Sequence, residues 1–197
     1  MATKLMKALD VAFGHPRGKV GALGGRVMAK VNARVEAHVV DVLAPTADEV
    51  VLVVGPGPGV GLRLVGERAA KAIGVDPSRV MLDEARDRCA DLIVTGRVEL
   101  REGTAARTGQ DASSADAVVS VDNLQLWDNR PAAFHELFRV LRPGGRLVVS
   151  AHRWSLDVAE YDLIGEAGAA GFTDVRTSLQ QHGGLPPAVQ LLAHVPA

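Results

Sequence analysis

Three closely spaced glycines and a downstream carboxylate are the residues whose types and spacing first indicate chemistry. Gly55, Gly57 and Gly59 follow an apolar run, and Asp76 comes about twenty residues after the first of them. Glycines let the backbone approach a ligand closely, and a helix that begins there directs free N–H groups at it. A carboxylate at Asp76 can accept hydrogen bonds from both hydroxyls of a ribose. The spacing predicts a nucleoside-containing ligand, and a tight turn without a ligand is the alternative that the glycines alone leave open.

A strand, a helix and a second strand are needed to position these residues. Val50–Val54 is short and apolar, which is typical of a strand in a parallel sheet covered on both faces. Residues 60–72 predict a helix with one apolar and one charged face, and residues 73–76 predict a second strand that ends on Asp76. The helix is long enough for a right-handed crossover between parallel strands. The ligand is therefore expected at the carboxyl ends of the strands.

The glycine spacing distinguishes between two kinds of nucleotide-binding turn. A dinucleotide fingerprint reads G-x-G-x-x-G, whereas this chain reads G-x-G-x-G from Gly55 to Gly59. In this it resembles motif I of the class I S-adenosylmethionine-dependent methyltransferases. Three other segments resemble the same family: an Asp before an apolar strand and polar loop (residues 116–127), a Leu-Arg-Pro-Gly-Gly turn before an apolar strand (residues 141–150), and a Gly-Phe pair at residues 171–172. The resemblance covers about residues 46–195.

The resemblance implies an α/β, Rossmann-like fold with S-adenosylmethionine as cofactor. Residues 46–197 are expected to form a seven-stranded, mostly parallel sheet with helices on both faces, ending on a hairpin-linked antiparallel strand. Further strands are expected at residues 98–102, 117–121, 146–150, 173–175 and 188–195, and further helices at residues 78–90, 131–141 and 159–170.

The resemblance also implies a set of cofactor-binding residues. The glycine turn holds the methionine end of the cofactor, and Asp76 binds the ribose. The remaining candidates are Pro77, Met81, Thr104, Ala105 and Val121. Met81 is equally suited to the hydrophobic core.

Two positions depart from the family pattern. Val53 stands where the family usually has an acid, two residues before the first glycine, and Thr104 stands where an Asp commonly binds the adenine amino group. A threonine hydroxyl can still accept a hydrogen bond, without the strength that a carboxylate gives. Loss of one charge-assisted contact costs roughly 1.5 to 3 kcal/mol. One interpretation is that the chain still binds the cofactor despite this loss. The other is that the chain belongs to the same fold but no longer catalyses methyl transfer.

Polar and aromatic residues after two later strands are candidates for the acceptor site. Asn123 and Gln125 can orient a polar acceptor, and Trp127 can stack on an aromatic group or cap the core. His152 is the candidate general base, because an imidazole can take a proton near neutral pH, and a hydrogen-bonding or surface role is its alternative. His15 and Trp154 complete the predicted substrate-binding set.

Residues 1–45 are expected to lie outside the sheet as a helical extension. Between residues 20 and 43 valines recur four residues apart, while Arg26, Lys30, Arg34 and Glu36 can face solvent. In the family that the chain resembles, such an extension often lies over the cofactor as a lid and lines the acceptor pocket. A helix that only covers a sheet edge is the alternative.

Composition excludes several classes of protein. The chain has 197 residues, 47% of them hydrophobic, and a net charge of −1, which suits one α/β domain and gives no footprint for nucleic acid. The apolar runs fall short of the roughly 18 residues that a membrane-spanning helix needs. Cys89 is the single cysteine, so an internal disulfide and a cysteine-based metal site are excluded, and a reducing cytoplasm is expected. A homodimer is compatible with the sequence.

The sequence thus predicts a cytoplasmic S-adenosylmethionine-dependent methyltransferase that acts on a small molecule. No metal is expected, because methyl transfer from a sulfonium needs neither a metal nor a protein nucleophile. Val53 and Thr104 keep two alternatives open. One is an enzyme of the same fold with another reaction, such as a cyclisation, and the other is a non-catalytic binding protein.

Overall fold

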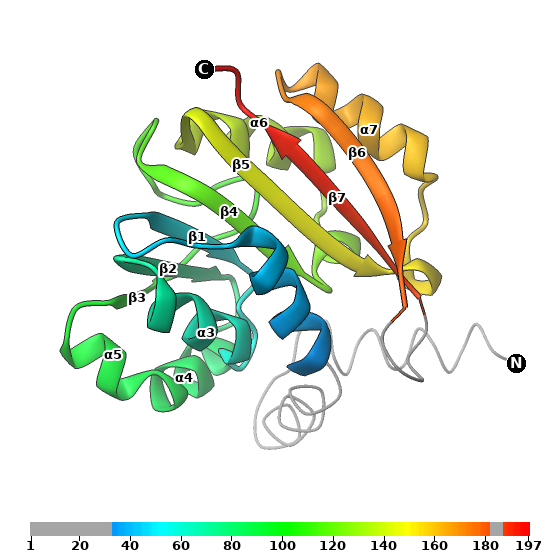
Figure 1. Ribbon diagram of the computed structural model, residues 1–197. Coiled ribbons are helices and arrows are strands. Elements are labelled where there is room, and N and C mark those ends of the chain that lie inside the picture. Colours follow the sequence, from blue (N-terminus) through cyan, green and yellow to red (C-terminus); the bar gives the residue numbers. More distant parts are fainter. Residues whose placement is uncertain (1–32, 182–186) are drawn as a thin grey trace, which may run out of the picture.

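The computed structural model describes residues 33–181 and 187–197. In these residues seven strands form one sheet in the order β3-β2-β1-β4-β5-β7-β6 (Figure 1). The strands β1 (Val50–Val54), β2 (Lys71–Asp76), β3 (Val98–Glu102), β4 (Ala115–Val121) and β5 (Leu141–His152) pair in parallel. The predicted Rossmann-like sheet is confirmed. The strand order reverses at β1, with β2 and β3 on one side of it and β4 and β5 on the other. Ligands of open α/β sheets bind at such a reversal, here between β1 and β4.

The last two strands, β6 (Thr173–Gln180) and β7 (Ala188–His194), form the predicted hairpin. β7 lies between β5 and β6 and is antiparallel to both. The strand predicted from residue 173 extends to Gln180. β5 begins at Leu141, within the segment predicted as a turn, because Leu141 already pairs with Ala115 of β4. The other predicted strands lie within two residues of their expected bounds.

Two hydrophobic clusters cover the two faces of the sheet because the side chains of a strand alternate between its faces. On β1, Leu52 and Val54 face the cluster formed with α6 (Arg130–Val140) and α7 (Glu160–Ala169). Val51 and Val53 face the opposite cluster, which contains α3 (Val60–Arg68) and the helix over residues 33–43. Every residue of β1 after the first is buried, as expected for a strand covered on both sides.

The first crossover helix is shorter than the sequence predicts. α3 ends at Arg68, and Lys71 and Ala72 already pair with Val50 and Val51 as the start of β2. Pairing with a fully apolar neighbour strand outweighs the helical tendency of the alanine-rich segment, so the prediction of a helix to residue 72 is wrong. Beyond β2, the chain forms α4 (Arg79–Arg88) and a short helix α5 (Ala90–Val94) that was not predicted.

A helix over residues 33–43 packs on the sheet before β1 begins. Val35, Val39, Val40 and Leu43 are buried, and Figure 1 shows this helix in front of the central strands. Arg146 of β5 fixes its end: the guanidinium donates to the carbonyls of Leu43 and Ala44 at 2.8 and 3.2 Å and pairs with Glu49 at 2.6 Å. The rest of the predicted extension, residues 1–32, lies outside the described residues.

Candidate functional site

The glycine turn after β1 requires glycine for two separate reasons. Gly55, Gly57 and Gly59 all have a positive φ, of 65°, 51° and 86°, which disfavours other residues. A Cβ on Gly55 would also overlap the side chain of Asn123, whereas a Cβ on Gly57 would meet no atom of the described residues within 4 Å. The space above Gly57 is therefore open, and the turn can receive a ligand there.

Asp76 ends β2 beside this turn, as the sequence predicts. Its side chain is 6% exposed, and Oδ1 accepts a hydrogen bond from the backbone N–H of Ser78 at 2.8 Å. Ser78 in turn caps α4 by accepting from Met81 N–H at 3.4 Å. The carboxylate is thus held in one orientation at the carboxyl end of its strand.

A cleft of about 260 Å³ joins the turn to Asp76. It is lined by all but one of the residues predicted to bind the cofactor; these lining residues are Gly55, Gly57, Asp76, Pro77, Met81, Thr104, Ala105 and Val121. Gly59 does not line it and instead packs against α4, where an added Cβ would lie 2.9 Å from Ala85 Cα. The structure brings these residues together from four different strand ends.

Two residues of the predicted acceptor site line the other side of the cleft. Asn123 lies over Gly55, and its Oδ1 accepts from the indole N–H of Trp127 at 2.9 Å. Trp127 is 8% exposed and packs edge-on against Phe134, with ring centroids 5.6 Å apart, so it belongs to the core and borders the cleft at once. Gln125 does not line the cleft and donates to the carbonyl of Asp122 at 2.9 Å.

His152, the predicted base, lies behind Asp122 and does not line the cleft. Its backbone N–H donates to Asp122 Oδ1 at 3.1 Å, and its Nε2 lies 3.5 Å from Asp122 Oδ2. Trp154 stacks on His152 and is 48% exposed, also outside the cleft lining. His15, the remaining candidate, lies outside the described residues.

Asp122 is the polar residue that the sequence prediction missed on this side. It lines the cleft with a φ of 50°, and burial raises its pKa against the lowering effect of His152. Its Oδ2 is buried and accepts no hydrogen bond from residues 33–181 or 187–197. The sequence offers one indication of this role, since Asp122 directly precedes the predicted acceptor-site residue Asn123.

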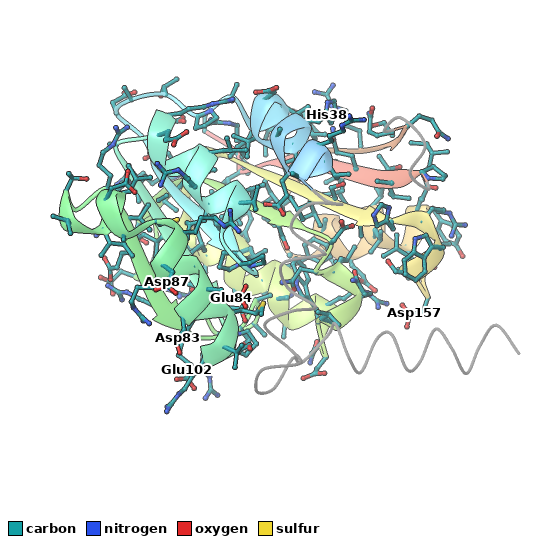
Figure 2. All side chains as sticks on the ribbon, turned by 90° about the horizontal axis from the view of Figure 1, so that it is seen from below. His38, Asp83, Glu84, Asp87, Glu102 and Asp157 are labelled. Carbon is teal, nitrogen blue, oxygen red and sulfur yellow. The ribbon has the colours of Figure 1, made fainter. Side chains whose placement is uncertain are left out.

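Glu36 is the second missed residue, and its predicted exposure to solvent is wrong. It lines the cleft from the helix over residues 33–43, and its Oε2 accepts a hydrogen bond from the backbone N–H of Gly61. Figure 2 shows His38, two residues further on, at the outer side of the same helix. Successive helical residues turn by about 100°, so the two side chains point in opposite directions. The valine period located this helix but did not show what its polar residues contact.

Residues 33–181 and 187–197 contain neither a cluster of metal ligands nor a membrane-spanning helix. No three His, Cys, Asp or Glu side chains lie together as a metal site would need. Within the same ranges, no helix has the length and apolar character that crossing a membrane requires.

The fold and the cleft define a class I, Rossmann-like methyltransferase domain. A family model described as "Methyltransferase domain" matches residues 52–149. Among curated proteins, the chain is 27% identical to the uncharacterized methyltransferase YdaC of Bacillus subtilis, over 78% of this chain and 87% of YdaC. Other methyltransferases are 31 to 38% identical, but this chain spans less than half of their length. The chain belongs to the class I S-adenosylmethionine-dependent methyltransferase family, as its motifs predict.

Solved structures show the same fold at low sequence identity. Phosphoethanolamine N-methyltransferase 2 of Haemonchus contortus, in complex with phosphomonomethylethanolamine and S-adenosylhomocysteine, is 15% identical with a TM-score of 0.79, over 92% of this chain and 59% of that one. The [4+2]-cyclase SpnF is 20% identical with a TM-score of 0.71, over 84% and 82%. These likenesses concern the fold.

Proposed function

We propose that this protein binds S-adenosylmethionine and transfers its methyl group to a small-molecule acceptor. The observation that carries the proposal is the cleft itself, in which a glycine turn with open space above Gly57 lies beside the buried carboxylate of Asp76. Complexes of a neighbour of the same fold with S-adenosylhomocysteine support the choice of cofactor. This cofactor supplies an activated methyl group on a sulfonium. The protein supplies the binding site and holds the acceptor in position.

Several residues of the chain fit this cofactor. Asp76 would bind the ribose, Met81 and Ala105 would border the base, and the turn from Gly55 to Gly57 would carry the amino-acid end. Thr104 replaces a carboxylate with a hydroxyl, which weakens one contact and leaves the others in place.

The catalytic contribution of the protein is mainly positioning. An in-line displacement is accelerated when the reacting atoms are held at near-attack distance in a site without bulk water, and this contributes about 7 to 11 kcal/mol in favourable cases. Trp127 and Asn123 form a fixed wall at the acceptor side, because each holds the other through a hydrogen bond. A cleft of about 260 Å³ and a chain with a net charge of −1 favour a small acceptor over a nucleic acid.

If the acceptor must lose a proton on methylation, the carboxylate of Asp122 is placed to take it, because Asp122 lines the cleft. His152 contacts Asp122 through its backbone N–H and its imidazole, so the base role proposed for His152 acts through this carboxylate. Asp122→Asn tolerates the positive φ and removes the basic oxygen. We expect both Asp122→Asn and His152→Ala to lower turnover, and His152→Ala to leave the affinity for the cofactor unchanged. Unchanged turnover in both variants would remove the pair from this role.

The test of the proposed function combines titration calorimetry with a transfer assay. S-adenosylmethionine and S-adenosylhomocysteine should bind the wild-type protein with micromolar affinity, and radiolabelled methyl should pass to a member of a panel of small amines, phenols and carboxylates. Absence of binding by both ligands would contradict the proposal.

A second candidate is a cyclisation in the same pocket. It is favoured by the lost acids at Val53 and Thr104 and by the fold shared with SpnF. Under this alternative the cofactor binds, but no methyl group leaves it during turnover of any acceptor.

The cytoplasm is the compartment we propose. The sole cysteine, Cys89, is buried, and burial raises the pKa of its thiol to about 11. It is therefore a packing residue that needs no oxidising environment.

A further inference from the structure

Glu36 occupies a position in the cleft that its place on an amphipathic helix does not explain. It lines the cleft together with Gly55, Gly57 and Gly61. Its Oε2 accepts from the N–H of Gly61, in the first turn of α3, and a Cβ on Gly61 would lie 2.8 Å from that oxygen. The absence of a side chain at residue 61 thus admits the carboxylate into the wall of the cleft.

This carboxylate lies on the side of the sheet to which residue 53 points. Val53 packs in the same buried cluster as Val39 and Val40 of the helix that carries Glu36. Both Val53 and Glu36 line the cleft. The carboxylate of Glu36 therefore lies on the face of the sheet toward which an acid at position 53 would also point. Val53 itself contributes only apolar contacts.

Glu36 is also at the end of the cleft opposite to the ribose site. Asp76 and Thr104 lie at the ends of β2 and β3, whereas Glu36 interacts electrostatically with Asp122, at the end of β4. The sheet order β3-β2-β1-β4 separates the two groups along the cleft. A ligand whose sugar is bound at Asp76 and whose chain crosses Gly57 would present its far end to Glu36 and Asp122.

We propose that Glu36 supplies the carboxylate that position 53 lacks and binds the ammonium group at the amino-acid end of the cofactor. The inference rests on the proposed function, since it assumes the same ligand in the same cleft. The recognised chemistry is a primary ammonium carried on a nucleoside thioether or sulfonium. The ammonium would bring a positive charge to a site with two carboxyl groups, Glu36 and Asp122.

The charges around Glu36 are consistent with a site for a cation. Burial, with a smaller contribution from Asp122, raises the pKa of Glu36 to about 7, against the lowering effects of the Gly61 N–H and the Arg88 guanidinium. Arg88 donates a hydrogen bond from Nε to the carbonyl oxygen of Pro58 at 2.7 Å. A bound ammonium favours the carboxylate form, so affinity should rise as the pH increases through 7.

The experiment separates recognition of the ammonium from a purely structural cap of α3. Glu36→Gln keeps an oxygen that can accept from Gly61 N–H and removes the negative charge. Two ligands are titrated at pH 8: S-adenosylhomocysteine, and 5′-methylthioadenosine, which has no amino-acid end. We expect the variant to lose roughly tenfold to a hundredfold in affinity for the first ligand and to bind the second as wild type does. Glu67→Gln, which removes an exposed carboxylate from α3, is the matched control and should change neither affinity.

A second variant tests whether position 53 can take over the role. Val53→Glu combined with Glu36→Gln should recover at least part of the lost affinity for S-adenosylhomocysteine, provided that thermal unfolding shows a folded protein. Unchanged affinity in Glu36→Gln, or an equal loss for both ligands, would overturn the proposal. Failure of the wild-type protein to bind either ligand would instead contradict the proposed function.

Discussion

The two ends of the cleft are built by different means. At the β2 end, backbone geometry and one fixed carboxylate form the site, with Asp76 held by Ser78 N–H and the turn shaped by glycines. At the β4 end, side chains from distant segments meet: Glu36 from the helix before β1, Asp122 after β4, and His152 at the end of β5. From this difference we infer that the β2 end would select a nucleoside by the shape of its backbone and one fixed carboxylate, while the properties of the β4 end depend on burial and charge.

The largest loss of cofactor affinity is expected from a substitution at Gly55, which lies between the two ends of the cleft. Gly55→Ala places a methyl group where the Asn123 amide lies, at a residue with positive φ. We expect cofactor affinity to fall more than a hundredfold, with lower thermal stability.

Gly57→Ala is the matched control for that prediction. Its methyl group meets no atom in the part of the chain that the structure describes, so the unfolding free energy should fall by only about 1 kcal/mol from backbone strain. The affinity should fall as well, because the ligand occupies that space. An affinity equal to wild type in Gly57→Ala would show that the ligand does not cross the turn.

Asp76→Ala tests the β2 end alone. It removes a charge-assisted acceptor, which should lower the affinity for S-adenosylhomocysteine roughly tenfold to a hundredfold in a calorimetric titration. Asp83→Ala is the control, since Asp83 is an exposed acid of α4 paired with Arg86, labelled in Figure 2. Equal losses in the two variants would mean that general charge, and not a ribose contact, determines binding.

Glu36→Gln tests the β4 end through stability and pH. The folded-state pKa of Glu36 is about 7, above its ordinary value of 4.5, because burial disfavours the carboxylate. The wild-type protein should therefore lose stability relative to the variant as the pH rises from about 4.5 through 7, by about 1 to 3 kcal/mol in total. Urea unfolding of both proteins at pH 5 and pH 8 measures this difference. A difference that is independent of pH would show that Glu36 is not desolvated.

The smallest effect is expected from restoring an acid at the nucleoside end. Thr104 lines the cleft near Ala105, and Thr104→Asp would offer a charged acceptor to an adenine amino group. We expect the affinity for S-adenosylhomocysteine to increase by about tenfold or less. A weaker affinity in this variant would place the base elsewhere in the cleft.

The same contrast explains how much could be predicted from the sequence. The glycine turn and Asp76 lie within one βαβ unit, so local spacing was sufficient to locate them. Glu36 and Gly61 come together only because the helix over residues 33–43 packs on the same face of the sheet as α3. No local sequence pattern indicates that contact. The end of α3 was misplaced for a similar reason, because pairing of Lys71 and Ala72 with β1 is a property of the sheet.

His152 shows an intermediate case. Its place at the end of β5 was predicted from the strand pattern, but the direction of its side chain, behind Asp122 and away from the cleft, depends on the neighbouring strand. Sequence spacing locates such residues at a sheet edge and does not determine which of them reaches the ligand.

The most direct test of the account is a crystal structure of the protein grown with S-adenosylhomocysteine. We predict that both Asp76 carboxylate oxygens lie within hydrogen-bond distance of the ribose, with the thioether chain passing over Gly57. A ligand bound elsewhere, or a ribose turned away from Asp76, would contradict the central claim that this carboxylate and this turn form the cofactor site.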